Sequence, residues 1–172
     1  MLRTIGFASL LVALLVVICT SGVQAQSVSM SAAANVMSAL TITAPASIDF
    51  GNVPASRTAV LDPKNAANSF VGSMATVGRI TITGANSTDL LVTFPSTITL
   101  SDGTPADNLT LTLSVTGDAS SANQAGSSAL STGATVTTSG SGNYSMWVGG
   151  SLPTGTNTNT FAGSATFAVE YK

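Results

Sequence analysis

The feature that most constrains the fold is a strict alternation of apolar and polar residues. Leucine or valine occupies every second position from Leu109 to Val115, and threonine or serine occupies the positions between them. Successive side chains of a β-strand point to opposite faces, so this pattern is typical of a strand with one buried face. The same alternation recurs at 80–83, 90–94, 98–100 and 165–172. We therefore expect a chain built from strands.

The last alternating stretch places Phe167, Val169 and Tyr171 on one face, which we expect to point toward the core. Between the stretches lie clusters of Gly, Pro, Ser, Asn and Asp that are typical of loops. They occupy residues 101–108, 117–128, 139–143 and 153–160. Seven to nine short strands separated by such loops, without helical periodicity, predict an all-β fold, namely an immunoglobulin-like antiparallel β-sandwich.

The first 25 residues predict a secretory signal peptide. Arg3 precedes an apolar run from Ile5 to Ile18, and small residues then lead to a cleavage site after Ala25. The run is shorter than the roughly 20 residues that a membrane-spanning helix needs. We expect residues 26–172 to form a single domain that is free of the membrane. Its expected location is the periplasm, the cell surface or the medium.

The supply of reactive side chains disfavours most enzymes. The chain has no histidine, and its single cysteine, Cys19, lies in the signal segment. A Ser-His-Asp triad is thereby excluded, and a cysteine nucleophile or a zinc site of the usual ligands is disfavoured. A net charge of −2 with only five basic residues also argues against nucleic-acid binding. We expect a non-enzymatic protein without cofactor or metal.

Some residues could carry chemistry but have a simpler interpretation. Lys64 lies in a turn-like segment, and Asp102, Asp107 and Asp118 lie in loops, where aspartate caps turns. Residues 102–108 could offer oxygen ligands to calcium, but they lack closely spaced carboxylates. A plain turn is the favoured interpretation there.

Two aromatic residues near the C-terminus could bind a ligand. Trp147, with its neighbour Tyr144, could offer a face on which a sugar ring stacks. A tryptophan within a strand more often packs into the protein, and that interpretation is favoured.

Several short motifs, taken in order, resemble the exported bacterial domain family DUF4402. They are Leu40-Thr41-Ile42-Thr43, Ile48-Asp49-Phe50-Gly51-Asn52-Val53, residues 78–84, residues 91–95, residues 147–152, residues 161–163 and residues 166–171. More distantly, the chain resembles the immunoglobulin-like pilins and spore-coat-protein-U-like subunits of chaperone-usher systems, because of its Asp-Phe-Gly motif and its penultimate aromatic residue, Tyr171. It lacks the cysteine pair of most such pilins.

The resemblance implies a secreted or surface structural protein, a fimbria-like or surface-assembly subunit that acts through β-strand association. Its expected partners are itself, related surface subunits or a periplasmic chaperone. The alternative is a carbohydrate-binding or adhesive module.

The segment from Gln26 to Val36 could donate a strand to a partner. It is uncharged, and apolar residues stand at every second position: Val28, Met30, Ala32, Ala34 and Val36. The alternative, that it is the first strand of its own sandwich, is favoured by the missing cysteine pair.

Overall fold

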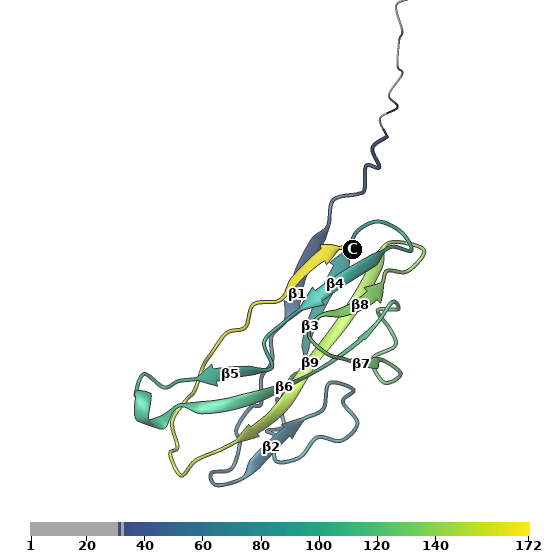
Figure 1. The fold of residues 1–172 in the computed structure, drawn as a ribbon. Coiled ribbons are helices and arrows are strands. Elements are labelled where there is room, and N and C mark those ends of the chain that lie inside the picture. The colour runs from purple at the N-terminus through teal and green to yellow at the C-terminus, as the bar shows by residue number, and fades with distance from the viewer. Residues whose placement is uncertain (1–30, 32) are drawn as a thin grey trace, which may run out of the picture. The chain divides into compact units, whose positions relative to one another are not determined.

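The computed structural model describes residue 31 and residues 33–172, and residues 36–172 form one compact unit. In this part of the chain the fold is all-β, with ten strands and one short 3₁₀ turn (Figure 1). The strands are β1 (Thr41–Ala46), β2 (Thr58–Leu61), β3 (Gly78–Thr83), β4 (Asp89–Thr93), β5 (Thr97–Leu100), β6 (Leu109–Asp118), β7 (Ser128–Leu130), β8 (Ala134–Thr137), β9 (Asn143–Pro153) and β10 (Ala168–Tyr171), and the turn η1 spans Pro105–Asp107. The all-β expectation is confirmed.

The strands form two antiparallel sheets. The larger sheet has the order β1-β3-β9-β6-β5, with β2 paired to β9 and β7 paired to β6. The smaller sheet has the order β10-β4-β8. The two sheets pack face to face, since buried residues from both meet in one hydrophobic cluster, here called the upper core. Its members are Ile80, Ile82, Leu90, Val92, Val115, Val136, Tyr144, Met146 and Val148.

A second cluster, here called the lower core, lies against the larger sheet alone. It consists of Phe50, Ala59, Leu61, Ile98, Leu111 and Leu152. None of these residues comes from the smaller sheet, and half-buried residues of the connecting segments, such as Val53, Val71 and Ala165, pack against them. The larger sheet therefore extends beyond the smaller one, and loops cover its lower half.

The alternation that predicted a strand at 109–116 is confirmed by β6. Leu111 and Val115 are buried, whereas Thr110, Thr112 and Ser114 are exposed. The pattern changes at Thr116, which is 3% exposed although it lies on the outer face. The hydroxyl of Ser127 donates a hydrogen bond of 2.8 Å to the Thr116 hydroxyl oxygen. A loop covers the outer face of the sheet at this point.

The long strand β9 changes its partner at two consecutive glycines. Its residues 143–148 pair with β3, whereas residues 150–153 pair with β2. A Cβ atom on Gly149 would collide with the carbonyl oxygen of Leu61, the last residue of β2. The absence of a side chain at Gly149 is what allows β2 to approach β9 beside β3.

The structure differs from the sequence expectation for the first and the last expected strand. Residues 33–36 lie in no strand, and Ala34 and Val36 are exposed. An integral first strand reaching Val36 is therefore wrong for these residues, because the edge of β3 is already paired with Thr41–Ala46. Val28, Met30 and Ala32 lie outside the described residues, as does the expected signal peptide. At the other end, the strand begins only at Ala168.

No helix among the residues placed by the structure combines the length and the apolar character needed to cross a bilayer.

Candidate assembly groove

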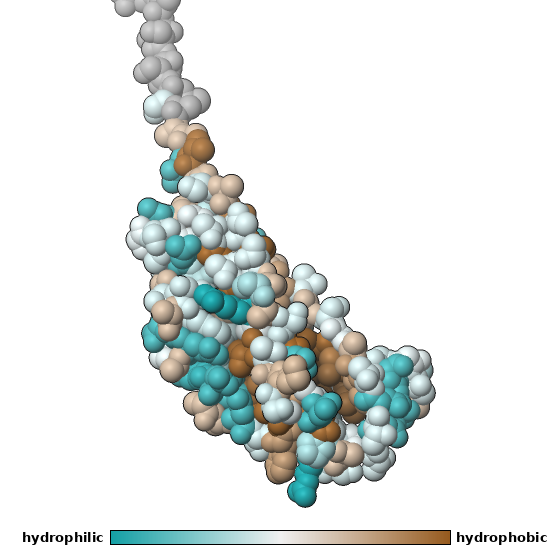
Figure 2. Space-filling view, turned by 180° about the vertical axis from the view of Figure 1, so that it is seen from behind, coloured by the Kyte–Doolittle hydropathy of each residue, from teal (hydrophilic) through white to brown (hydrophobic). Residues whose placement is uncertain are grey.

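An open groove with a volume of about 1160 Å³ lies over the lower half of the larger sheet. Its floor consists of apolar residues of β5, β6 and β9, namely Ile98, Leu100, Leu109, Leu111, Val148 and Leu152. Figure 2 shows hydrophobic residues gathered in the lower half of one face of the domain. The smaller sheet does not reach this region, and segments outside the strands cover most of the floor: Ile98, Leu111 and Leu152 are buried, whereas Leu100 and Leu109 are half-buried.

One wall of the groove is the segment that follows β1. It includes Ile48, Phe50 and Val53. Asp49 fixes its path, because its carboxylate accepts a hydrogen bond of 2.7 Å from the backbone N–H of Gly51. Gly51 has a φ of 62°, which is the left-handed region that favours glycine. The Asp-Phe-Gly motif of the sequence therefore forms a tight turn that buries Phe50 in the lower core.

The opposite wall is the segment that leads into β10, residues 157–167. An isolated bridge between Ser101 and Ala162 pairs it with the end of β5. Side chains attach it at two further points. The Asn159 side-chain amide donates a hydrogen bond of 2.6 Å to the carboxylate of Asp102. The ring of Phe167 stacks on Phe94, with 5.4 Å between the ring centroids.

The sandwich is open where its first and last strands meet. β1 pairs only with β3, and β10 pairs only with β4, so each has one free edge among the described strands. Ile42 lies opposite Ile82 of the upper core, yet it is 42% exposed. Val169 and Tyr171 of β10, together with Phe167, are half-buried and pack against the upper core. Ile42, Phe167, Val169 and Tyr171 therefore form a partly exposed apolar strip along β1 and β10, which continues from the groove and is here called the seam.

Trp147 is buried on the side of the sheet that faces away from the upper core. Its neighbours Met146 and Val148 belong to that core, so Trp147 points to the other face. Its cross-strand partners are Arg79 and Thr116. Arg79 donates a hydrogen bond of 3.2 Å to the carbonyl of Ser121, and Thr116 is bonded to Ser127. The loop that contains both serines covers the indole, which is 4% exposed.

Tyr144 is also buried, on the opposite face, where it belongs to the upper core and is 6% exposed. Burial, with a smaller contribution from the negative charge of Asp118, raises the pKa of Tyr144 to about 12. Buried rings have no free face for a sugar. The structure therefore excludes the ligand-stacking interpretation for Trp147 and Tyr144, and both residues are structural.

The carboxylates of Asp102 and Asp118 act as turn caps. Asp102 accepts a hydrogen bond of 2.8 Å from the backbone N–H of Thr104, and this bond, with the one from Asn159, lowers the pKa of Asp102. Asp118 accepts one of 2.7 Å from the N–H of Ser120. Lys64 lies in the turn after β2, where its N–H donates to Asp62. Over residue 31 and residues 33–172, no three His, Cys, Asp or Glu side chains could together hold a metal ion.

Sequence reasoning missed the groove because its two walls come from segments without a regular pattern. The motif Ile48-Asp49-Phe50-Gly51 gave a local signal for one wall. In the other wall, residues 157–160 were predicted as part of a loop and residues 165–167 as part of the last strand, and neither prediction indicated a groove.

Comparison with known proteins gives no family. No family model matches the chain, and no curated protein matches it. Among solved structures, the chain is similar to one described as "Chaperone-tip adhesin complex is vital for synergistic activation of CFA/I fimbriae biogenesis", with 12% sequence identity and a TM-score of 0.40. The match covers 77% of this chain and 42% of the other, so this chain corresponds to less than half of the other's length.

Proposed function

We propose that this chain is a non-enzymatic, exported surface subunit that assembles with further copies of itself by β-strand association. The segment from Gln26 to Val36 of one copy is the donor, and the assembly groove of another is the acceptor. The observation that carries the proposal is the groove with its apolar floor, which lies below the free edges of the first and last described strands.

The donor segment has the chemistry that the groove requires. A strand added at a sheet edge forms main-chain hydrogen bonds and places alternate side chains in pockets. Five of the six apolar residues of 26–36 stand at this spacing, the exception being Ala33, and the segment carries no charge. Eleven extended residues span about 36 Å, which is more than the length of a typical strand. The part of the segment that the structure describes is exposed and outside the sheets, with Val36 91% exposed.

The composition of the chain also favours assembly through strand edges. Proteins protect free edges with charged residues, lysine above all, or with proline. This chain has five basic residues in 172, and β1 carries none of them. β1 does contain one proline, Pro45, near its end, so the part of the edge without such protection is residues 41–44.

Single substitutions in the donor test the proposal without touching the folded unit. We expect Met30→Asp to abolish the concentration-dependent growth of oligomers, because a charge cannot enter an apolar pocket unpaired. Ser29→Asp, which adds the same charge on the opposite face of the donor strand, should leave assembly nearly unchanged. Size-exclusion chromatography with light scattering measures both variants. Equal loss or equal persistence of assembly would contradict the assigned face.

Deletion of residues 26–36 tests the segment as a whole. The truncated chain should remain monomeric and unfold in urea with the midpoint of the monomeric parent chain, because residues 33–36 make no strand pairing of their own. A synthetic peptide of residues 26–36 should then bind the truncated chain and raise its unfolding midpoint. Truncated protein that still forms large assemblies would refute the role of this segment.

We also propose that the chain is exported with a cleaved signal peptide and that it is related to the DUF4402 domains it resembles. A signal peptide cleaved after Ala25 would expose Gln26 as the N-terminus of the donor, and the resemblance to DUF4402 and to chaperone-usher subunits favours a surface location and a periplasmic chaperone as transient partner. Mass spectrometry of the exported protein tests the cleavage site. Chain that retains residues 1–25 after export would contradict it.

A further inference from the structure

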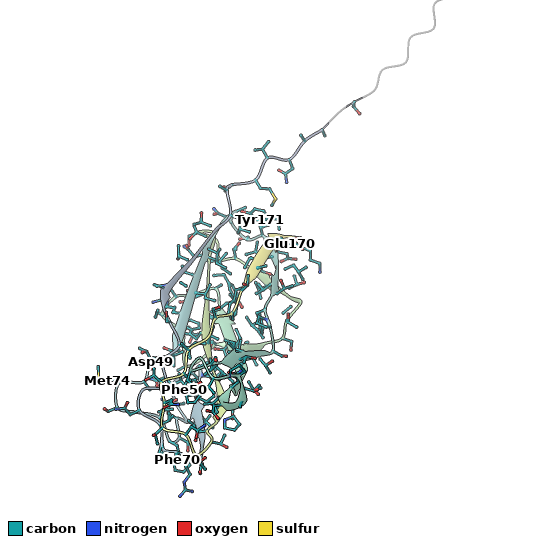
Figure 3. All side chains as sticks on the ribbon, turned by 90° about the vertical axis from the view of Figure 1, so that its left-hand side faces the viewer. Asp49, Phe50, Phe70, Met74, Glu170 and Tyr171 are labelled. Atoms are coloured by element: carbon teal, nitrogen blue, oxygen red, sulfur yellow. The ribbon has the colours of Figure 1, made fainter. Side chains whose placement is uncertain are left out.

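A second hollow, with a volume of about 480 Å³, lies at the far end of the domain. Its lining combines an aromatic ring, an arginine and several hydroxyl groups, and its residues are Ser56, Arg57, Thr58, Phe70 and Pro153–Thr156. Figure 3 shows Phe70 at the end of the domain opposite Tyr171. Arg57 and Phe70 do not line the assembly groove.

Arg57 and Phe70 form a pair at this hollow. The guanidinium carbon of Arg57 lies 5.3 Å from the centre of the Phe70 ring. At this distance the negative face of the ring attracts the cation and limits its orientation. The planar guanidinium has five N–H donors, and contact of its face with a ring leaves the N–H groups at its edge able to bind a carboxylate.

The position of Phe70 is fixed on both sides. The backbones of Ser69 and Val60 form two hydrogen bonds with each other, of 2.8 and 2.9 Å. These bonds attach Ser69, the residue before Phe70, to β2. Val71, the following residue, packs against the lower core. Between these anchors Phe70 has a φ of 53° and remains 49% exposed. A left-handed conformation is uncommon for an aromatic residue, and such strain clusters at binding sites.

The floor of the hollow is held by hydrogen bonds around Thr154. The Thr154 hydroxyl accepts a hydrogen bond of 3.0 Å from the backbone N–H of Arg57 and lies 2.8 Å from the Pro54 carbonyl oxygen. The N–H of Ser56 donates to the carbonyl of Gly155 at 2.8 Å, and Ser56 itself has a φ of 54°. The backbone around Arg57 is therefore preorganised, and little ordering of it is needed on binding.

We propose that this hollow binds a carboxylated sugar. The Arg57 guanidinium pairs with the sugar carboxylate, the exposed edge and face of Phe70 contact the C–H surface of the ring, and the hydroxyls of Ser56, Thr58 and Thr156 bond the sugar hydroxyls. A neutral sugar lacks the partner of Arg57, and a simple carboxylate lacks the contact with Phe70. Assembly through the groove does not require this site, so the two proposals fail separately.

The experiment compares matched pairs of sugars. The methyl glycosides of glucuronic, galacturonic and N-acetylneuraminic acid, and the neutral counterpart of each, are titrated into ¹⁵N-labelled protein and followed by NMR. We expect at least one carboxylated sugar to bind with a Kd of about 1 mM, typical of a small single-site ligand, and about tenfold more tightly than its neutral counterpart. The shifted amide signals should include those of Phe70 and Thr156.

Variants assign the binding to this hollow. Arg57→Gln should weaken the carboxylated sugar about tenfold and leave the neutral one unchanged, whereas Phe70→Ala should weaken both. Lys64→Gln removes the same charge outside the hollow and should change neither. Urea unfolding of each variant confirms that it is folded. The proposal is overturned if no sugar binds below about 20 mM, if the acid and neutral sugars bind equally, or if folded Arg57→Gln binds like the parent.

Discussion

The hydroxyl of Tyr171 donates a hydrogen bond of 2.8 Å to the carbonyl oxygen of Ser38. The same hydroxyl oxygen accepts a bond of 2.6 Å from the backbone N–H of Ala85. The penultimate residue of the chain thus connects β10 both to the segment before β1 and to the turn after β3. Since β1 and β10 each have a free edge, this side chain closes the upper end of the open seam.

Tyr171→Phe should therefore loosen the segment before β1. Loss of both hydrogen bonds leaves two backbone groups without these partners, and we expect the free energy of unfolding to fall by about 1–2 kcal/mol. Hydrogen exchange should also become faster in residues 38–41. Glu170→Gln, which changes the exposed neighbour, serves as the control in urea unfolding. Equal stability of the two variants would mean that the Tyr171 hydroxyl contributes nothing to holding the seam.

Tyr144 makes the stability of the domain sensitive to alkaline pH. Burial raises the pKa of the Tyr144 phenol from about 10 in the unfolded chain to about 12 in the folded chain. Between these values the unfolded state binds fewer protons, so the free energy of unfolding falls as pH rises. The chain has only two tyrosines, so absorbance at 295 nm of Tyr171→Phe reports Tyr144 alone.

The absorbance titration of that variant should have its midpoint near pH 12. Tyr144→Phe should lose less stability than the parent chain between pH 10 and 12. A midpoint near 10 in the folded protein would contradict the burial of this phenol.

Gly149 should not tolerate a side chain. A Cβ atom there meets the carbonyl oxygen of Leu61, so Gly149→Ala must push β2 away from β9. We expect a loss of about 1–3 kcal/mol in the free energy of unfolding. Gly140→Ala is the matched control, because no atom lies within 4 Å of its Cβ position. Thermal unfolding measures both, and similar losses would show that the close approach of β2 is unimportant.

The sequence predicts a strand well where one face of the strand is buried and the other is exposed to solvent. β6 is the clearest case, and β3, β4 and β5 follow the same pattern. β2, β7 and β8 were not predicted, because β2 has apolar residues at consecutive positions and β7 and β8 each contain only one large apolar residue. Trp147 does not follow the alternation of buried and exposed faces, because it lies on the outer face and is nevertheless buried by a loop. That loop is attached by hydrogen bonds to Arg79 and Thr116, which the local sequence does not indicate.

The candidate site was less predictable than the fold. The apolar spacing of 26–36 indicated a donor strand, but not whether its own sheet already had a first strand. That question depends on Thr41–Ala46, which pairs with β3 and leaves residues 33–36 outside the sheet. The groove depends on the short length of the smaller sheet, a long-range property that arises only when both sheets are assembled.

The strongest test of the fold uses two adjacent residues of β6. Leu111 is 3% exposed and belongs to the lower core, whereas Thr112 faces solvent. Leu111→Asp places a charge among apolar side chains without a partner, and we expect a loss of more than about 4 kcal/mol, enough to unfold many domains. Thr112→Asp should cost less than about 1 kcal/mol. Circular dichroism during urea unfolding distinguishes them, and equal losses would mean that the faces of β6 are assigned wrongly.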